Sequence, residues 1–65
     1  MNKIEQLLNE LNKKFTKEDG MFKTTYYVGD ITIEVVGNTA TIKDIHGFYT
    51  SKINEPFLNY LKTIL

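Results

Sequence analysis

Residues 24–42 read TTYYVGDITIEVVGNTATI, and this stretch decides the fold. Apolar and polar side chains alternate along it with a period of two, which is typical of β-strands that bury one face. Gly29-Asp30 and Gly37-Asn38 interrupt the alternation, and a pair with glycine first suits a type I′ or II′ hairpin turn. The stretch therefore predicts three short strands between residues 21 and 45, joined as an antiparallel meander.

The register of this meander follows if both turns are two residues long. Val28 then pairs with Ile31, Tyr26 with Ile33, Thr24 with Val35, Val35 with Ala40, and Ile33 with Ile42. One face becomes apolar and carries Phe22, Tyr26, Val28, Ile31, Ile33, Val35, Ala40 and Ile42. The other carries Lys23, Thr25, Tyr27, Thr32, Glu34, Val36, Thr39, Thr41, Lys43 and Ile45. Because a slip by one residue would exchange the faces, burial of the apolar set should hold the pairing in place.

A helix is predicted before the meander, from residue 2 to about residue 17. Its apolar stripe recurs at three- and four-residue spacing and consists of Ile4, Leu7, Leu8, Leu11 and Phe15. Asn2 with Glu5 three residues later resembles a capping box at its start. We expect this helix to end between Phe15 and Asp19.

A second helix is predicted after the meander, beginning near Asn54. Pro56 is tolerated only in the first turn of a helix, which makes Asn54 the better cap. The apolar stripe of this helix is Phe57, Leu58, Leu61, Ile64 and Leu65. Residues 46–51 are predicted to form a connection, with Phe48 folded under the second helix to close the core.

The predicted fold is α+β: a helix, a three-stranded antiparallel meander and a helix in a single domain, residues 1–65. Two amphipathic helices need a partner surface, and only one sheet face is apolar. We therefore expect both helices side by side on that face, in two layers, with the second face open to water.

Composition excludes several classes of function. The 65 residues include 8 lysines, 8 acidic residues, one histidine and no cysteine, and the net charge is zero. His46 is the only histidine, Ser51 the only serine, and Asp44 stands two residues before His46, but one residue of each catalytic type does not define a catalytic site. We predict no enzyme activity, no metal site and no cofactor. No apolar run is long enough to cross a bilayer, and without cysteines a cytoplasmic protein is expected.

The order helix, three antiparallel strands, helix resembles the double-stranded RNA-binding domain. That resemblance implies binding of nucleic acid through basic side chains, and the basic cluster available here is Lys13, Lys14 and Lys17. Nucleic acid is not expected as the direct ligand, however, because the chain has no arginine and no net positive charge. Binding of nucleic acid remains the alternative hypothesis.

Binding to another protein is the leading hypothesis. Several aromatic and apolar side chains have no place in the predicted core, and such groups are enriched in protein interfaces. The candidate partner-binding residues lie on the open face and in the segment after it: Tyr27, Glu34, Val36, Lys43, Ile45, His46, Phe48 and Tyr49. A homodimer through the threonine-rich open face is the alternative assembly.

Size, order of elements and a composition typical of a low-GC genome resemble small phage and prophage accessory proteins, including anti-CRISPR proteins. This resemblance implies an inhibitor that occupies the surface of a larger host protein, such as a CRISPR nuclease. Inhibitors that imitate nucleic acid carry a dense acidic surface. Acidic residues and lysines are interspersed here in equal number, which favours steric or conformational blockade.

Overall fold

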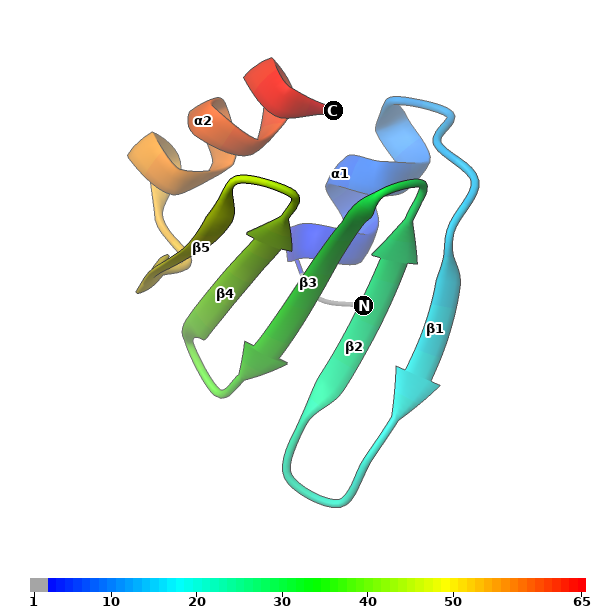
Figure 1. Ribbon diagram of the computed structural model, residues 1–65, viewed down its shortest axis with the longest axis vertical. Helices are drawn as coiled ribbons and strands as arrows, with labels where there is room; N and C mark the ends of the chain where they lie inside the picture. Colours follow the sequence, from blue (N-terminus) through cyan, green and yellow to red (C-terminus); the bar gives the residue numbers. More distant parts are fainter. Residues whose placement is uncertain (1–2) are drawn as a thin grey trace.

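The computed structural model describes residues 3–65. In chain order the elements are α1 (Lys3–Glu10), β1 (Thr16–Asp19), β2 (Thr24–Val28), β3 (Ile31–Val36), β4 (Thr39–Asp44), β5 (Gly47–Lys52) and α2 (Glu55–Ile64). The strands form one antiparallel sheet in the order β1-β2-β3-β4-β5, so that neighbours in sequence are neighbours in space (Figure 1). The α+β class with an antiparallel sheet is confirmed, but the sheet has five strands, and the predicted count of three was wrong.

The central meander has the predicted register. Val28 faces Ile31, Tyr26 faces Ile33, and Ile33 faces Ile42 across β2, β3 and β4. Gly29 and Gly37 have φ angles of 61° and 59°, the left-handed conformation that these tight hairpin turns require. The turn glycines and the alternating apolar face therefore determine the middle of the sheet together.

The first helix is shorter than predicted, because Asn12 stops it. Asn12 has a φ of 56°, its amide donates to the Asn9 carbonyl at 3.1 Å, and the Lys13 amide donates to the Leu8 carbonyl at 3.0 Å. This pattern is the Schellman ending of a helix, with asparagine as the left-handed residue. The prediction of helix up to residue 17 was wrong for this reason, and the predicted cap at Asn2 lies outside the described residues.

The chain that follows Asn12 forms β1, which pairs with β2. Thr16 pairs with Tyr27, and Asp19 pairs with Thr24. Phe15, the residue before the strand, packs edge-on against the Tyr26 ring with the ring centroids 5.6 Å apart. Phe15 thus reaches the core from the start of a strand rather than from the end of a helix.

The segment predicted as a connection is the fifth strand. Asp44 pairs with Gly47 around a two-residue turn, and the Asp44 Oδ1 atom accepts a hydrogen bond from the His46 amide at 2.8 Å. This Asx turn, with Gly47 at a φ of 133°, sends the chain back along β4. Phe48 then points away from α2 and is 77% exposed, so its predicted burial was wrong.

The second helix begins where the sequence indicates. The Asn54 Oδ1 atom accepts a hydrogen bond from the Phe57 amide at 3.0 Å, and Pro56 lies in the first turn. Both observations confirm Asn54 as the cap. The core lies between the two helices and one face of the sheet, and its buried residues are Ile4, Leu7, Leu8, Tyr26, Val28, Ile33, Val35, Ala40, Ile42, Phe57 and Leu61.

Phe22 does not belong to this core, contrary to the prediction. It lies in the loop between β1 and β2 and is 83% exposed, because the Gly20 amide donates to the Lys23 carbonyl and closes a turn that takes Phe22 out of the strand. Within residues 3–65, neither helix has the length and apolar character that crossing a membrane requires.

Candidate interaction surface

The sheet face opposite the helices carries side chains from all five strands, and we call it the open face. The pairings that place Tyr26, Ile33 and Ile42 in the core direct the alternate residues of each strand to this side. The open face consists of Thr16, Glu18, Thr25, Tyr27, Thr32, Glu34, Val36, Thr39, Thr41, Lys43, Phe48, Thr50 and Lys52.

A row of polar side chains crosses the middle of the open face. Consecutive pairings align Glu18, Thr25, Glu34, Thr41 and Thr50, one residue from each strand. The Thr41 and Thr50 hydroxyls are hydrogen-bonded at 3.0 Å, and Thr25 is only 6% exposed. Because threonine is β-branched, the three threonines of this row have few χ1 rotamers in a strand and are held in restricted orientations.

Glu34 is the electrostatic centre of the open face. Its Oε2 atom accepts from Lys23 Nζ at 3.0 Å, and its Oε1 atom lies 3.0 Å from Lys43 Nζ. The hydrogen bonds from Lys23 and Lys43 lower the pKa of the Glu34 carboxyl below its usual range. The carboxylate is therefore fully ionised at neutral pH, and the two lysines are held against the sheet.

Tyr27 is held near the β1 edge of the same face. Its hydroxyl donates a hydrogen bond to Glu18 Oε2 at 3.2 Å. The negative charge of Glu18 and this hydrogen bond raise the pKa of the Tyr27 phenol. Tyr27 therefore presents a neutral ring of restricted orientation to the solvent.

Apolar side chains surround this polar centre. Phe48 lies opposite Lys43 at the β5 side, and Val36, at the end of β3, is 51% exposed. Ile45, in the turn between β4 and β5, is 85% exposed. Burial of hydrophobic side chains of this size is favourable, so Phe48 and Val36 on the open face and Ile45 in the adjoining turn are the groups best suited to binding.

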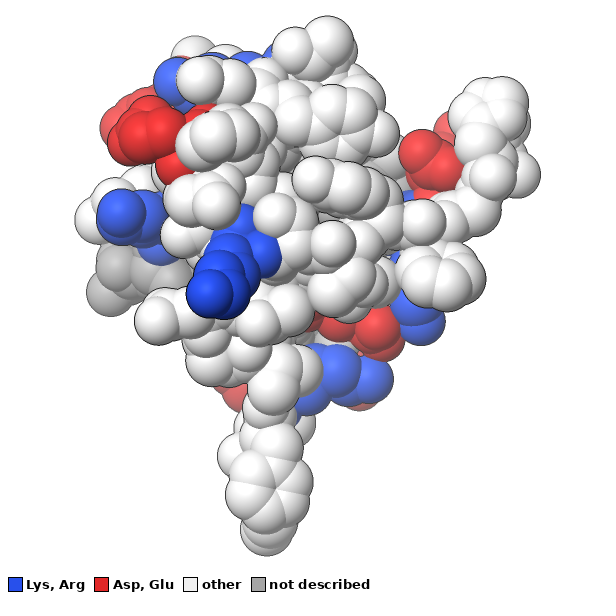
Figure 2. Space-filling model, turned by 90° about the vertical axis from the view of Figure 1, so that its left-hand side faces the viewer, with Lys and Arg blue, Asp and Glu red and all other residues white. Residues whose placement is uncertain are grey.

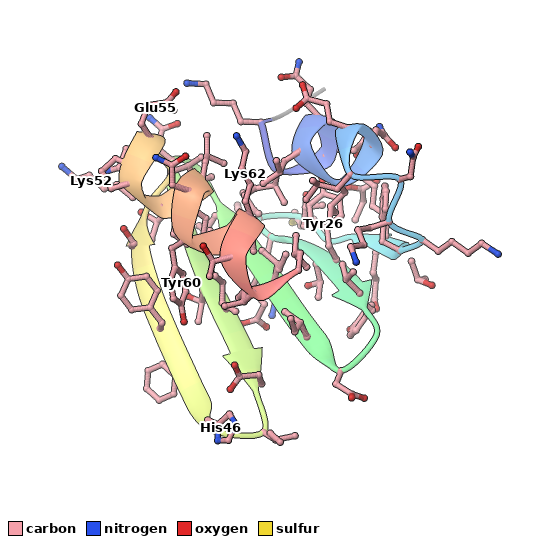
Figure 3. All side chains as sticks on the ribbon, turned by 90° about the horizontal axis from the view of Figure 1, so that it is seen from above. Tyr26, His46, Lys52, Glu55, Tyr60 and Lys62 are labelled. Carbon is pink, nitrogen blue, oxygen red and sulfur yellow. The ribbon has the colours of Figure 1, made fainter. Side chains whose placement is uncertain are left out.

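The structure brings most of the predicted partner-binding residues together. Tyr27, Glu34, Lys43 and Phe48 share the open face, and Val36 lies at its end. His46 is next to Ile45 in the β4–β5 turn. Figure 3 shows His46 beside the start of β5, at the opposite end of that strand from Lys52.

Tyr49 lies on the other side of the sheet. Its ring stacks on Phe57 with centroids 6.4 Å apart and meets Tyr60 edge-on at 5.3 Å. It is 48% exposed, at the border of a shallow hollow where β5 meets α2. The hollow is lined by Ile42, Asp44, His46, Gly47, Phe48, Tyr49 and Tyr60.

The three lysines of the alternative hypothesis do not form one surface with the open face. Lys13 and Lys14 lie in the segment between α1 and β1, near Gly29 and the carboxyl end of α2. Lys17 lies in β1 on the helix side, where its Nζ atom is 2.8 Å from Glu5 Oε1. The hydrogen bond to Glu5 raises the pKa of Lys17, and the charge of Lys17 is already matched.

The residues of catalytic type make local contacts. Asp44 accepts from the His46 amide, as described above, and the Ser51 hydroxyl donates to the Lys52 carbonyl at 3.0 Å. Among residues 3–65, no group of three histidine or acidic side chains could hold a metal ion.

Sequence reasoning missed two parts of this surface. The sequence pattern predicts Thr50 in a connection and Thr16 and Glu18 at the end of a helix, and it predicts no element for Lys52. The signal for β5 was the Asp-x-x-Gly turn at residues 44–47, followed by the β-forming residues Phe48, Tyr49 and Thr50. The signal for β1 was Asn12, which favours a left-handed helix ending.

Comparisons with protein families, with curated proteins and with solved structures found no match to this chain.

Proposed function

We propose that this protein is a non-catalytic binding module whose open face docks on the surface of a larger protein. The observation that carries the proposal is the exposure of Phe48, Val36 and Ile45 near the ion-paired polar centre of the open face. Protein interfaces combine apolar groups that lose water with polar groups whose positions specify the partner.

The polar centre supports specificity. Glu34 and its two lysines are already in place before a partner arrives, so little side-chain entropy is lost on binding. Thr32, Thr41 and Thr50 add hydroxyls that both donate and accept hydrogen bonds. A complementary surface would carry charged and polar groups at its centre, placed against Glu34, Lys43 and Lys52, and apolar groups around that centre.

The charges on the open face favour a protein partner over a nucleic acid. Phosphate backbones are bound by several free cationic side chains. On the open face, Lys23 and Lys43 are both engaged by Glu34, and Glu18 adds a further negative charge. Lys23 and Lys43 thus serve to orient the Glu34 carboxylate rather than to bind phosphates.

The specific form that we propose is inhibition of a bacterial defence nuclease of the CRISPR type by occupation of its surface. Equal numbers of acidic residues and lysines support blockade of a protein surface rather than imitation of DNA. The small size of the chain is compatible with covering one functional site of a large enzyme.

Capture of partners from the lysate of a low-GC bacterium, with nuclease treatment and mass spectrometry, tests the proposal. The Phe48→Ala/Val36→Ala variant is compared with wild type and with Phe22→Ala, a control that removes an exposed aromatic ring outside the open face. We expect wild type and Phe22→Ala to retain one large protein in near-equal amount, and the open-face variant to lose at least ten-fold, about 1.4 kcal/mol of binding.

Other results would contradict the proposal. Equal retention by all three proteins would remove the open face as the binding surface. Retention of material that disappears after nuclease treatment, and that depends on Lys13 and Lys14, would favour binding of nucleic acid. A captured protein that is not a defence nuclease would support the binding module and overturn its specific form.

A further inference from the structure

The two edges of the sheet differ in a way that bears on assembly. The β1 edge is short, and three of its four residues are charged: Lys17, Glu18 and Asp19. Such charges protect an edge strand from pairing with another chain. The β5 edge has six residues, GFYTSK, with one charge at its end and no proline. In the described part of the chain, β5 has a neighbour on one side only.

The backbone groups at the β5 edge can be assigned from the hydrogen-bond alternation. The turn-closing pair Asp44 and Gly47 is a hydrogen-bonded pair, and the Ile53 amide donates to the Asn38 carbonyl at 2.7 Å. Both ends of β5 therefore show that its odd-numbered residues bond to β4. The amides and carbonyls of Phe48, Thr50 and Lys52 point away from the sheet.

We propose that β5 pairs with β5 of a second copy of this chain, antiparallel and centred on Thr50. In this register Thr50 faces Thr50 of the partner subunit, and Phe48 faces Lys52 of the partner subunit. Every outward backbone group of β5 then has a partner, because all three outward residues fall in hydrogen-bonded pairs. The two sheets become one sheet of ten strands.

The side chains in this register are complementary to themselves. On the open face, the Lys52 cation lies beside the Phe48 ring of the other copy, an arrangement that suits a cation–π contact. On the helix side, the bulky Tyr49 faces the small Ser51, which leaves space for the ring. The Thr50 pair extends the existing Thr41–Thr50 hydrogen bond across the interface. The zero net charge of the chain means that two copies do not repel each other overall.

The position of α2 leaves room for the second copy. α2 begins above the carboxyl end of β5 and runs diagonally over β4 toward the middle of the sheet (Figure 3). Its last residues, Ile64 and Leu65, lie near the turn between β2 and β3. Most of the side of the molecule that carries β5 and α2 is uncharged (Figure 2). Lys52 extends outward from this edge, where the partner strand would lie (Figure 3).

This inference goes beyond the proposed function and does not rest on it, since it concerns the edge of the sheet and a second copy of the chain. It also has a consequence for that function, because pairing at β5 would join two open faces side by side and double the area available to a partner.

Cysteine cross-linking tests the register, because the chain has no cysteine of its own. Opposed residues in a hydrogen-bonded pair have Cα atoms about 5.5 Å apart, within the range that a disulfide bridges. We expect Thr50→Cys to form a disulfide-linked dimer readily under mild oxidation. Thr16→Cys, an exposed threonine on the same face at the β1 edge, is the matched control and should remain largely monomeric.

Sedimentation equilibrium and amide hydrogen exchange test the unmodified protein. The mass should rise with concentration from 7.5 kDa toward twice that value, and the amides of Phe48, Thr50 and Lys52 should gain protection in parallel. Thr50→Lys places like charges at the two-fold axis and should keep the mass at that of one chain, whereas Thr16→Lys should not.

A mass that stays at 7.5 kDa at millimolar concentration would overturn the inference. So would equal cross-linking of Thr50→Cys and Thr16→Cys, or a dimer that forms without protection of the three outward amides. A partner protein that protects these amides while the free chain stays monomeric would show that the β5 edge receives a strand from another protein. None of these results decides whether the open face binds a partner, which the capture experiment measures separately.

Discussion

Tyr49 of β5 stacks on Phe57 of α2, with ring centroids 6.4 Å apart and ring planes 13° from parallel. This contact joins the last strand to the last helix. Phe48, which precedes Tyr49 in β5, points to the opposite face of the sheet. The two adjacent aromatic residues therefore have different roles, one in stability and one on the open face.

Tyr49→Ala should lower the free energy of unfolding by about 2 kcal/mol, because it removes a half-buried ring and its aromatic contacts. Phe48→Ala, the matched control, should change it by less than about 0.5 kcal/mol. Urea denaturation of both variants measures the difference. A larger loss for Phe48→Ala than for Tyr49→Ala would contradict the assignment of the two faces of β5.

Asn12→Ala should destabilise the protein by about 1 kcal/mol, because alanine adopts the left-handed conformation at this position less readily than asparagine. Asn12→Gly should leave the stability equal or slightly higher, since glycine adopts that conformation freely. Thermal denaturation followed by circular dichroism compares the two variants. Equal destabilisation by both would show that the asparagine side chain, rather than the backbone conformation, is required.

Asn54→Ala should cost about 1 kcal/mol, because the Phe57 amide loses its acceptor at the start of α2. Asn54→Asp should retain most of the stability, since aspartate is an equally good cap. Chemical denaturation measures both variants, with Asn59→Ala on the exposed side of the same helix as the control. Because alanine has a higher helix propensity than asparagine, Asn59→Ala should be neutral or stabilising, and a cost equal to that of Asn54→Ala would contradict the capping role of Asn54.

Glu34→Gln should lower the stability at neutral pH by about 1 kcal/mol or less, because both ion pairs involve exposed lysines. The pKa of Glu34 is lowered in the folded state, so its stabilising contribution is complete above the usual glutamate pKa of about 4.3. The contribution is lost as the pH falls through the lower pKa of the folded protein. The stability difference between wild type and Glu34→Gln should therefore shrink toward pH 3.

A double-mutant cycle with Lys23→Gln isolates the Lys23–Glu34 pair from other effects of the substitution. High salt should weaken the coupling, since the lysines are exposed. A difference between wild type and Glu34→Gln that is independent of pH would show that shape or hydrogen bonding, rather than charge, is responsible.

The parts of the fold that were predictable depend on contacts close in sequence. The turns at Gly29 and Gly37 and the cap at Asn54 are signalled by the residues that form them. The register of β2, β3 and β4 follows from the turns and from burial of one face. The candidate residues Tyr27, Glu34 and Lys43 were predicted to share a face for the same reason.

The parts that were not predictable depend on a competition that local pattern does not decide. Leu7, Leu8, Leu11 and Phe15 have helical spacing, yet the chain turns at Asn12 and Phe15 packs against Tyr26. The β1 strand has no buried residue of its own, so its sequence shows no alternation of apolar and polar residues that would predict a strand. Its pairing with β2 is stable because the sheet offers an edge and because Lys17 reaches Glu5 of α1.

By itself the sequence determined the class of fold, the central register and the start of α2, because each rests on turn chemistry, capping or alternation within a few residues. Only the tertiary structure decided the five-stranded sheet, the outward direction of Phe48 and the union of five strands in one open face. Those features depend on pairing at strand edges and on contacts between side chains from distant segments. A local pattern does not show with which of several compatible strands a given strand will pair.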